Sequence, residues 1–201
     1  MQGFNRRCGL ALLCAGVLAA LLNLILTPLL LNSDAPPAAR PTTSVYLLRQ
    51  SASAVVALLL IFGSLGLHLA QRAASGVFGA AAFLSAFMGS CFLFAVEFAD
   101  VFVLRPVAQA SADTYLAIDK DPLMNLGFAS AVGLFAVGWI LLSINVLRTG
   151  RHARWAAVAT LAGPFLIPAL QAACGVIGAI VGNVVLGVGW MGLGWSLARS
   201  D

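Results

Sequence analysis

The chain has 201 residues, of which 61% are hydrophobic and only 9% are charged, and its formal net charge is +4. A soluble domain carries about 25% charged residues, so this composition argues against a soluble globule and against a disordered segment. The apolar runs are continuous and do not alternate as the strands of a membrane barrel do, which predicts an all-α polytopic transmembrane bundle. The basic residues lie singly or in short clusters near helix ends, so we expect a lipid bilayer as partner and no nucleic acid.

Six apolar segments are long enough to span a bilayer, because a membrane helix needs about twenty apolar residues. We expect them to form one domain over residues 1–201. The expected helices cover residues 8–31, 51–71, 77–104, 124–147, 154–172 and 175–198. The first follows Arg6 and Arg7 as a signal peptide would, but its apolar stretch is longer than a usual signal, so we expect an uncleaved helix.

The basic residues set the expected orientation, because cytoplasmic loops carry an excess of Lys and Arg. With the N-terminus inside, seven fall on the cytoplasmic side: Arg6, Arg7, Arg72, Arg148, Arg151, Arg154 and Arg199. Four fall outside: Arg40, Arg49, Arg105 and Lys120. We therefore expect both termini in the cytoplasm. The preference for Arg over Lys and the abundance of Ala suggest a bacterium, and thus a bacterial cytoplasmic (inner) membrane.

The second helix carries His68, with Ser64 one turn before it on the same face. A histidine titrates near neutral pH, so this face is a candidate proton relay. The alternative is a polar residue at a helix end without further role. His68 is expected near the cytoplasmic end, on the opposite side of the membrane from the acids of the third helix.

Glu97 and Asp100 are the only charges in the apolar run from Gly79 to Leu104. A charged side chain at membrane depth costs at least ~2.5–3.5 kcal/mol, which makes this pair the strongest functional candidate in the chain. At 100° per residue, both acids fall on the face of small residues that packs against other helices. The neighbouring stripe, expected to meet lipid or a large partner, is formed by Phe83, Phe87, Phe94, Phe98 and Phe102.

Three interpretations of this pair remain open. It caps the span at the outer interface and meets Arg105, or it binds a proton or a cation, or it supplies a catalytic acid to an intramembrane cavity. Arg105-Pro106 is expected to end or bend the third helix. The depth and the surroundings of Glu97 decide between the three.

The two longer loops are expected outside. Residues 32–45 contain three prolines and are expected to be extended and irregular. Residues 107–118 are expected to form a short interfacial helix, with Tyr115 at headgroup level. Asp121-Pro122 then gives the N-terminal signal of the fourth helix. The loop acids Asp113, Asp119 and Asp121 form no convincing metal motif, and we expect no metal.

The junction of the fourth and fifth helices, from Leu147 to Ala156, has the sequence Leu-Arg-Thr-Gly-Arg-His-Ala-Arg-Trp-Ala. It resembles a recurrent loop of small bacterial six-helix membrane protein families known only as domains of unknown function. The resemblance implies the same helix count and brings no activity or site residue. In the fifth helix, Pro164 and Pro168 are expected to kink the chain and free backbone carbonyls.

The sixth helix carries a seven-residue repeat of small residues, which keeps one small stripe towards a neighbouring helix. The stripe and its second seam comprise Gly175, Gly178, Gly182, Gly189, Gly192 and Ser196. The neighbour lies either within the chain or in a second subunit of a homo- or hetero-oligomer. Asn183 and Asn23 are expected to hydrogen-bond across helices.

Common enzyme signatures and histidine clusters are absent from the sequence, and we expect no cofactor. The favoured function is a small transport, substrate-binding or accessory membrane subunit with an acidic pair towards the outer side of the third helix. The alternatives are an intramembrane enzyme acting on a lipid or isoprenoid, and a purely structural helix-packing partner. Whether the chain is an enzyme stays open at this stage.

Overall fold

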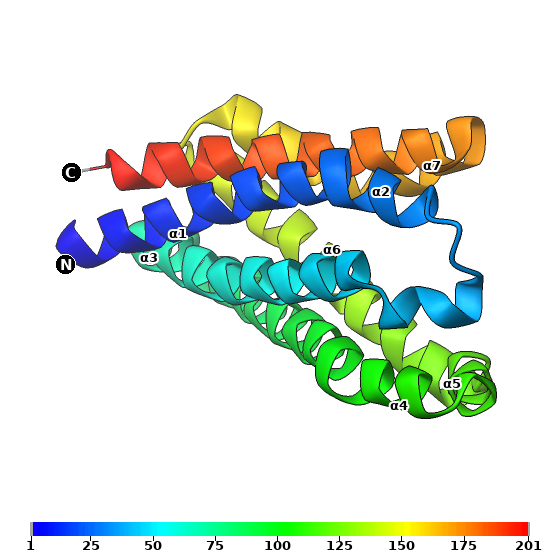
Figure 1. Cartoon of the computed structure of the whole chain (residues 1–201). Helices are drawn as coiled ribbons and strands as arrows, with labels where there is room; N and C mark the ends of the chain where they lie inside the picture. The colour runs from blue at the N-terminus through cyan, green and yellow to red at the C-terminus, as the bar shows by residue number, and fades with distance from the viewer. Residues whose placement is uncertain (1, 201) are drawn as a thin grey trace.

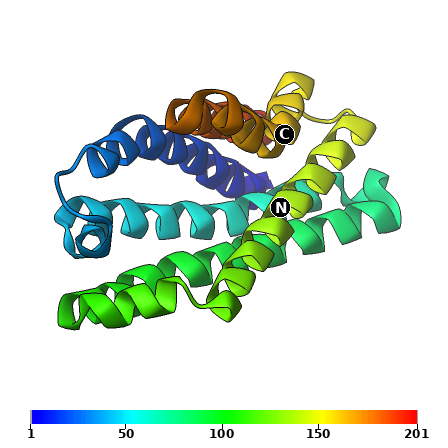
Figure 2. The ribbon, with the colours of Figure 1, turned by 90° about the vertical axis from the view of Figure 1, so that its right-hand side faces the viewer.

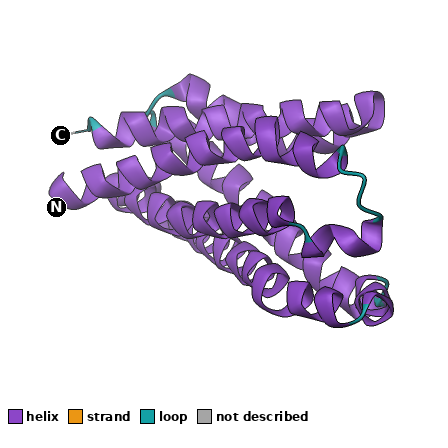
Figure 3. Cartoon of the chain, in the orientation of Figure 1, coloured by secondary structure: helices purple, strands orange, loops and turns teal. Residues whose placement is uncertain are grey.

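A computed structural model of the chain describes residues 2–200. This part of the chain is helical almost throughout and contains no strand, which confirms the predicted all-α class (Figure 3). The helices are α1 (Gln2–Leu21), α2 (Thr27–Leu31), α3 (Ser44–Ala99), α4 (Arg105–Ala110), α5 (Ala112–Asp119), α6 (Pro122–Thr149) and α7 (Arg154–Ala198). Two π-helical stretches, η1 (Leu22–Leu26) and η3 (Asp100–Leu104), and one 3₁₀ helix, η2 (Pro37–Thr42), connect them.

Two glycines with positive φ divide the longest helices. Gly76 has φ +56° inside α3, and Gly175 has φ +63° inside α7, a backbone region that favours glycine because it lacks a Cβ. Each glycine reverses the chain, so that α3 and α7 are helical hairpins with two arms each (Figures 1 and 2). Six helical arms result, covering residues 2–31, 44–75, 77–110, 122–149, 154–174 and 176–198.

Each arm contains the corresponding predicted segment, apart from Gly175, which is itself the turn. Four continuous helical stretches are long and apolar enough to cross a membrane: Gly3–Leu31, Ser44–Ala110, Pro122–Thr149 and Arg154–Ala198. The described part of the chain is therefore a membrane-type helical bundle.

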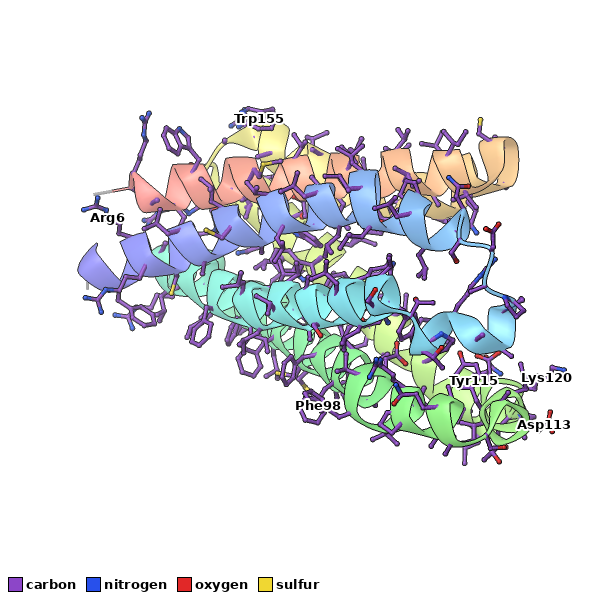
Figure 4. The ribbon with its side chains drawn as sticks, viewed as in Figure 1. Arg6, Phe98, Asp113, Tyr115, Lys120 and Trp155 are labelled. Carbon is purple, nitrogen blue, oxygen red and sulfur yellow. The ribbon has the colours of Figure 1, made fainter. Side chains whose placement is uncertain are left out.

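The bundle has two distinct ends (Figure 1). Both chain termini lie at one end, called here the terminal end, together with the Gly76 turn and the loop 150–153. The loop end, opposite, carries residues 32–43, α4, α5 and the Gly175 turn. Side chains of Arg6 and Asp113 mark these two ends in Figure 4.

Close glycine contacts bring the arms together. A Cβ on Gly182 would lie 2.8 Å from the Ile167 Cα, and one on Gly194 would lie 2.9 Å from the Leu12 carbonyl carbon. The second arm of α7 is thus packed against its own first arm on one side and against α1 on the other. The small-residue stripe predicted for the sixth helix is covered within the chain at Gly178, Gly182, Gly189 and Gly192.

The connections at the loop end differ from expectation in two places. The single helix expected over residues 107–118 is divided by Ser111, whose extended backbone separates α4 from α5. Residues 37–42 form the 3₁₀ helix η2 in place of an extended segment, with Pro37 in its first turn and Pro41 buried. Proline fixes φ near −65°, which also suits a 3₁₀ turn, so the proline content alone did not distinguish the two conformations. As predicted, Asp121 begins the next helix, where its side chain accepts hydrogen bonds of 2.9 Å from two backbone amides of α6.

Candidate functional site

A cavity of about 480 Å³ lies inside the bundle, within the size range of about 300–1,000 Å³ typical of small-molecule sites. All six arms contribute to its wall. The lining residues are Ala19, Leu22, Asn23, Arg49, Ser53, Val56, Leu60, Leu93, Glu97, Val132, Phe135, Ala136, Pro164, Ile167, Pro168, Asn183, Leu186 and Trp190. The cavity is therefore a product of the assembled fold and belongs to no single helix.

Glu97 is the acid that reaches this cavity. Its Oε2 atom is buried and has no hydrogen-bond partner. Among the described residues, no Lys, Arg or His nitrogen lies within 4.0 Å of an acidic oxygen, so Glu97 has no ion pair there either. An unpaired buried carboxylate oxygen costs free energy, which a proton or a cationic ligand would offset.

Asp100 is held by a chain of side chains and is not part of the cavity wall. The Gln50 amide donates a hydrogen bond of 2.5 Å to its Oδ2, and Arg49 donates to the Gln50 Oε1. The Arg49 Nε donates to the Thr27 Oγ1 at 3.2 Å, which links the first arm of α3 to α2. The two acids predicted as a pair thus have different surroundings, since one faces the cavity and the other is hydrogen-bonded.

Arg105 lies apart from the cavity. It has no ion pair with Glu97 or Asp100, and its Nε is buried without a partner. The helical path does not end at Pro106, because η3 and α4 carry it on to Ala110, thirteen residues or about 20 Å beyond Glu97. Phe98, next to Glu97, is accordingly drawn between the two ends of the bundle, well short of Tyr115 and Lys120 (Figure 4).

The expected phasing of this arm is confirmed for its small residues and for two of the five phenylalanines, whereas Phe83, Phe87 and Phe94 are partly buried. Gly79, Ala82, Ala86 and Gly89 are buried, whereas Phe98 and Phe102 are exposed on the outer surface. The side of small residues faces the bundle interior, which directs Glu97 inwards.

The cavity changes character along its length. Arg49 lies five residues, about 7.5 Å, into α3 from the loop end, whereas Leu60 lies sixteen residues, about 24 Å, into the same helix. Polar lining residues gather near the loop end, and the deeper wall is apolar with Leu60, Phe135 and Trp190. The Trp190 Nε1 is the exception there, because it is buried without a hydrogen-bond partner.

Two asparagines in the wall correct a prediction. The Asn23 side chain donates to the Ala19 carbonyl at 2.9 Å, and the Asn183 side chain donates to the Ala179 carbonyl at 2.9 Å. Both bonds stay within one helix, so the expected bonds across helices are wrong. Both residues are part of the cavity wall.

His68 and Ser64 do not line the cavity. His68 stacks on Phe83 with ring centroids 4.4 Å apart, and its Nδ1 is buried without a partner. The Ser64 hydroxyl donates to the Ile61 carbonyl at 2.9 Å. As expected, His68 lies near the terminal end, eight residues before the Gly76 turn, so it forms no common site with Glu97.

A buried polar network near the terminal end escaped the sequence analysis. The Asn145 amide donates to the Gln71 Oε1 at 2.9 Å and to the Ser75 Oγ at 3.0 Å, and the Thr149 hydroxyl donates to the same Gln71 oxygen at 3.2 Å. This network joins α3 and α6. Isolated amides in apolar helices were the available signal, because such groups require partners in a bilayer.

Ser196, predicted as a packing residue, closes the loop 150–153 onto the end of α7. Its hydroxyl accepts from the Ala153 backbone amide at 3.2 Å and lies 3.4 Å from the His152 Nδ1. Burial lowers the pKa of His152, and the neighbouring Arg151 lowers it further. Both effects favour the neutral form of His152.

Within residues 2–200, no three metal-ligating side chains gather at one place. No known protein family matches the chain, and neither does any curated protein or solved structure. The resemblance of residues 147–156 to uncharacterised six-helix families stays a prediction. What the site can do chemically therefore follows from its geometry: it can enclose a small molecule and present one unpaired carboxylate to it.

Proposed function

We propose that the protein is a multi-pass protein of a bacterial inner membrane that binds a small organic cation or a proton in its cavity, as a transport or substrate-binding subunit. The supporting observation is the unpaired Glu97 oxygen in a cavity lined by all six arms. Both termini are proposed to face the cytoplasm, since the seven arginines of the predicted cytoplasmic side fall at the terminal end.

The net charge of the side chains at the cavity favours a cation as the ligand. Arg49 is linked to Asp100 through Gln50, which bonds to both, and it lines the cavity together with Glu97, so the three charged groups sum to one negative charge. Glu97 then contributes one negative charge that no cation within 4.0 Å offsets. A ligand with one positive charge, or a proton on Glu97, restores neutrality in a site with few polar groups.

The test is binding of tetraethylammonium, a small water-soluble cation, to the purified protein in detergent. Glu97→Gln keeps the size and removes the charge, and we expect it to weaken binding by about tenfold or more, which corresponds to ~1.4 kcal/mol. Asp113→Asn is the matched control, because it removes one acidic charge from the exposed helix α5 outside the cavity. Equal binding by wild type and Glu97→Gln would refute the proposal.

An enzyme acting on a lipid or isoprenoid is the second candidate. It needs an acid that a buried cavity reaches, and Glu97 in its largely apolar surroundings meets this requirement. Glu97 is the only acid among the described lining residues, so it would have to serve as both acid and base. Turnover of an added lipid extract that depends on Glu97, measured by mass spectrometry, would favour this candidate over transport.

A role as a structural partner has less support. Of the stripe for which a second subunit was one of two possible neighbours, Gly178, Gly182, Gly189 and Gly192 are covered by the first arm of α7. An oligomer formed through the sixth helix would need another surface of that arm, where exposed Val181 and Val188 lie.

A further inference from the structure

The first third of α6, at the loop end, has little cover from the rest of the chain. All residues from 121 to 130 are exposed, and so are all residues from 171 to 177 at the Gly175 turn of α7. In Figure 2, α6 and α7 lie close together near the loop 150–153 and diverge towards the loop end; Figure 1 shows the same divergence. The two helices therefore leave one side of the bundle open over their loop-end halves.

The cavity reaches the molecular surface on this side. Val132 of α6 and Pro168 of α7 line it and are both exposed, and the partly buried Phe135 and Ile167 lie one turn or less behind them. The opening on this side is thus lateral, between α6 and α7.

The exposed stretches on this side carry several large apolar side chains. Leu126 and Phe128 lie on α6, and Ile177 lies on α7. Such side chains suit the hydrocarbon region of a bilayer and offer no hydrogen bonds to a hydrated solute. We therefore expect a ligand that enters between these side chains to come from the membrane and not from water.

The wall of the cavity is polar at one end and apolar at the other, as an amphiphilic molecule is. Its charged and amide groups, Glu97, Arg49 and Asn23, lie towards the loop end, and its depth is formed by Leu60 and Phe135 among other apolar side chains. A head with one positive charge matches Glu97, while a single hydrocarbon chain matches the apolar depth.

We infer that the ligand is a single-chain amphiphilic amine that enters from the bilayer between the loop-end halves of α6 and α7, with its head at Glu97 and its chain towards Phe135 and Trp190. This inference rests on the proposed function and adds the class of ligand and its route. The ammonium group supplies the missing positive charge, and the chain moves from lipid to an apolar wall without crossing water.

The experiment uses the full chain in phosphatidylcholine vesicles with a long-chain alkylamine that carries a photoreactive diazirine at its chain end. We expect wild-type labelling on the cavity wall near Phe135 and Trp190, mapped by mass spectrometry, and at least about tenfold less with the alcohol of equal chain length. Val132→Trp, which narrows the opening, should reduce the amine labelling by a similar factor. Val137→Trp is the matched control, because Val137 is exposed on the same helix and does not line the cavity.

The outcomes separate this inference from the proposed function. Unchanged labelling in Val132→Trp, with Val132→Phe as the milder second variant, would overturn the lateral route. Equal labelling by amine and alcohol would overturn the cationic head, and labelling confined to the outer surface of α3 would overturn the binding mode. In each of these cases, loss of tetraethylammonium binding in Glu97→Gln would leave the proposed function standing.

Discussion

The clearest prediction concerns Gly189, where two helical arms of α7 meet. A Cβ at this position would lie 2.6 Å from the Thr160 backbone nitrogen and 3.0 Å from its Cα. Non-bonded heavy atoms prefer about 3.5–4.0 Å, so Gly189→Ala must push the arms apart by about 1 Å. Overpacking costs about 1–3 kcal/mol, and Ala regains about 0.5–1 kcal/mol through its better helix propensity. The midpoints of these ranges give an expected net loss of about 1 kcal/mol.

The assay is equilibrium unfolding by SDS in mixed micelles, followed by circular dichroism. Gly133→Ala is the control, because its Cβ would meet nothing within 4 Å and the propensity gain should appear alone. If Gly189→Ala is as stable as wild type but changes the size of the detergent-solubilised particle, then the glycine stripe packs against a second subunit, and the intramolecular assignment is wrong.

Two further predictions concern the terminal end. Asn145→Leu removes hydrogen bonds to Gln71 and Ser75 and leaves both groups buried, so we expect a loss of about 1–2 kcal/mol by the same unfolding assay. Ser143→Ala removes a buried hydroxyl that has no partner and should cost nothing; an equal loss in both variants would contradict the argument. Because burial lowers the pKa of His152, the unfolded chain binds the proton more readily than the folded chain, and the free energy of unfolding should fall as pH drops below about 6.5. His152→Gln should flatten this dependence between about pH 7.5 and 5.5. Parallel curves of unfolding free energy against pH for the variant and the wild type would refute the argument.

The helical architecture could be predicted because it depends on local properties. Length and continuity of the apolar runs identify each arm, and the glycine at the α7 turn marks where two runs meet. The phase of the arm carrying Glu97 followed from 100° per residue and from the contrast between small side chains and phenylalanines. Each of these arguments needs only neighbours in the sequence.

The depth of Glu97 and the bonding of Asp100 could not be predicted in the same way. Arg105-Pro106 was expected to end or bend the third helix. The helix does not end there, because the π-helical η3 precedes Pro106 and the helical path continues to Ala110. A π-turn has i→i+5 hydrogen bonds and so accommodates the missing amide of proline in a manner that residue type alone does not reveal. The partner of Asp100, Gln50, lies fifty residues away on the other arm of α3.

The positions of the glycines also explain why a cavity exists where it does. Gly89 and Gly138 bring α3 and α6 into backbone contact, because a Cβ on either one would lie 2.5 Å from the Cα of a residue on the other helix. Further towards the loop end, Gly133 and Gly127 have open space around them, so the same residue type makes no contact there. Close packing of α6 against α3 therefore ends at about the level of the cavity. Beyond this level the glycines of α6 contact no other helix, and α6 separates from α7. An α6 held in contact along its whole length would close the space that Glu97 now faces.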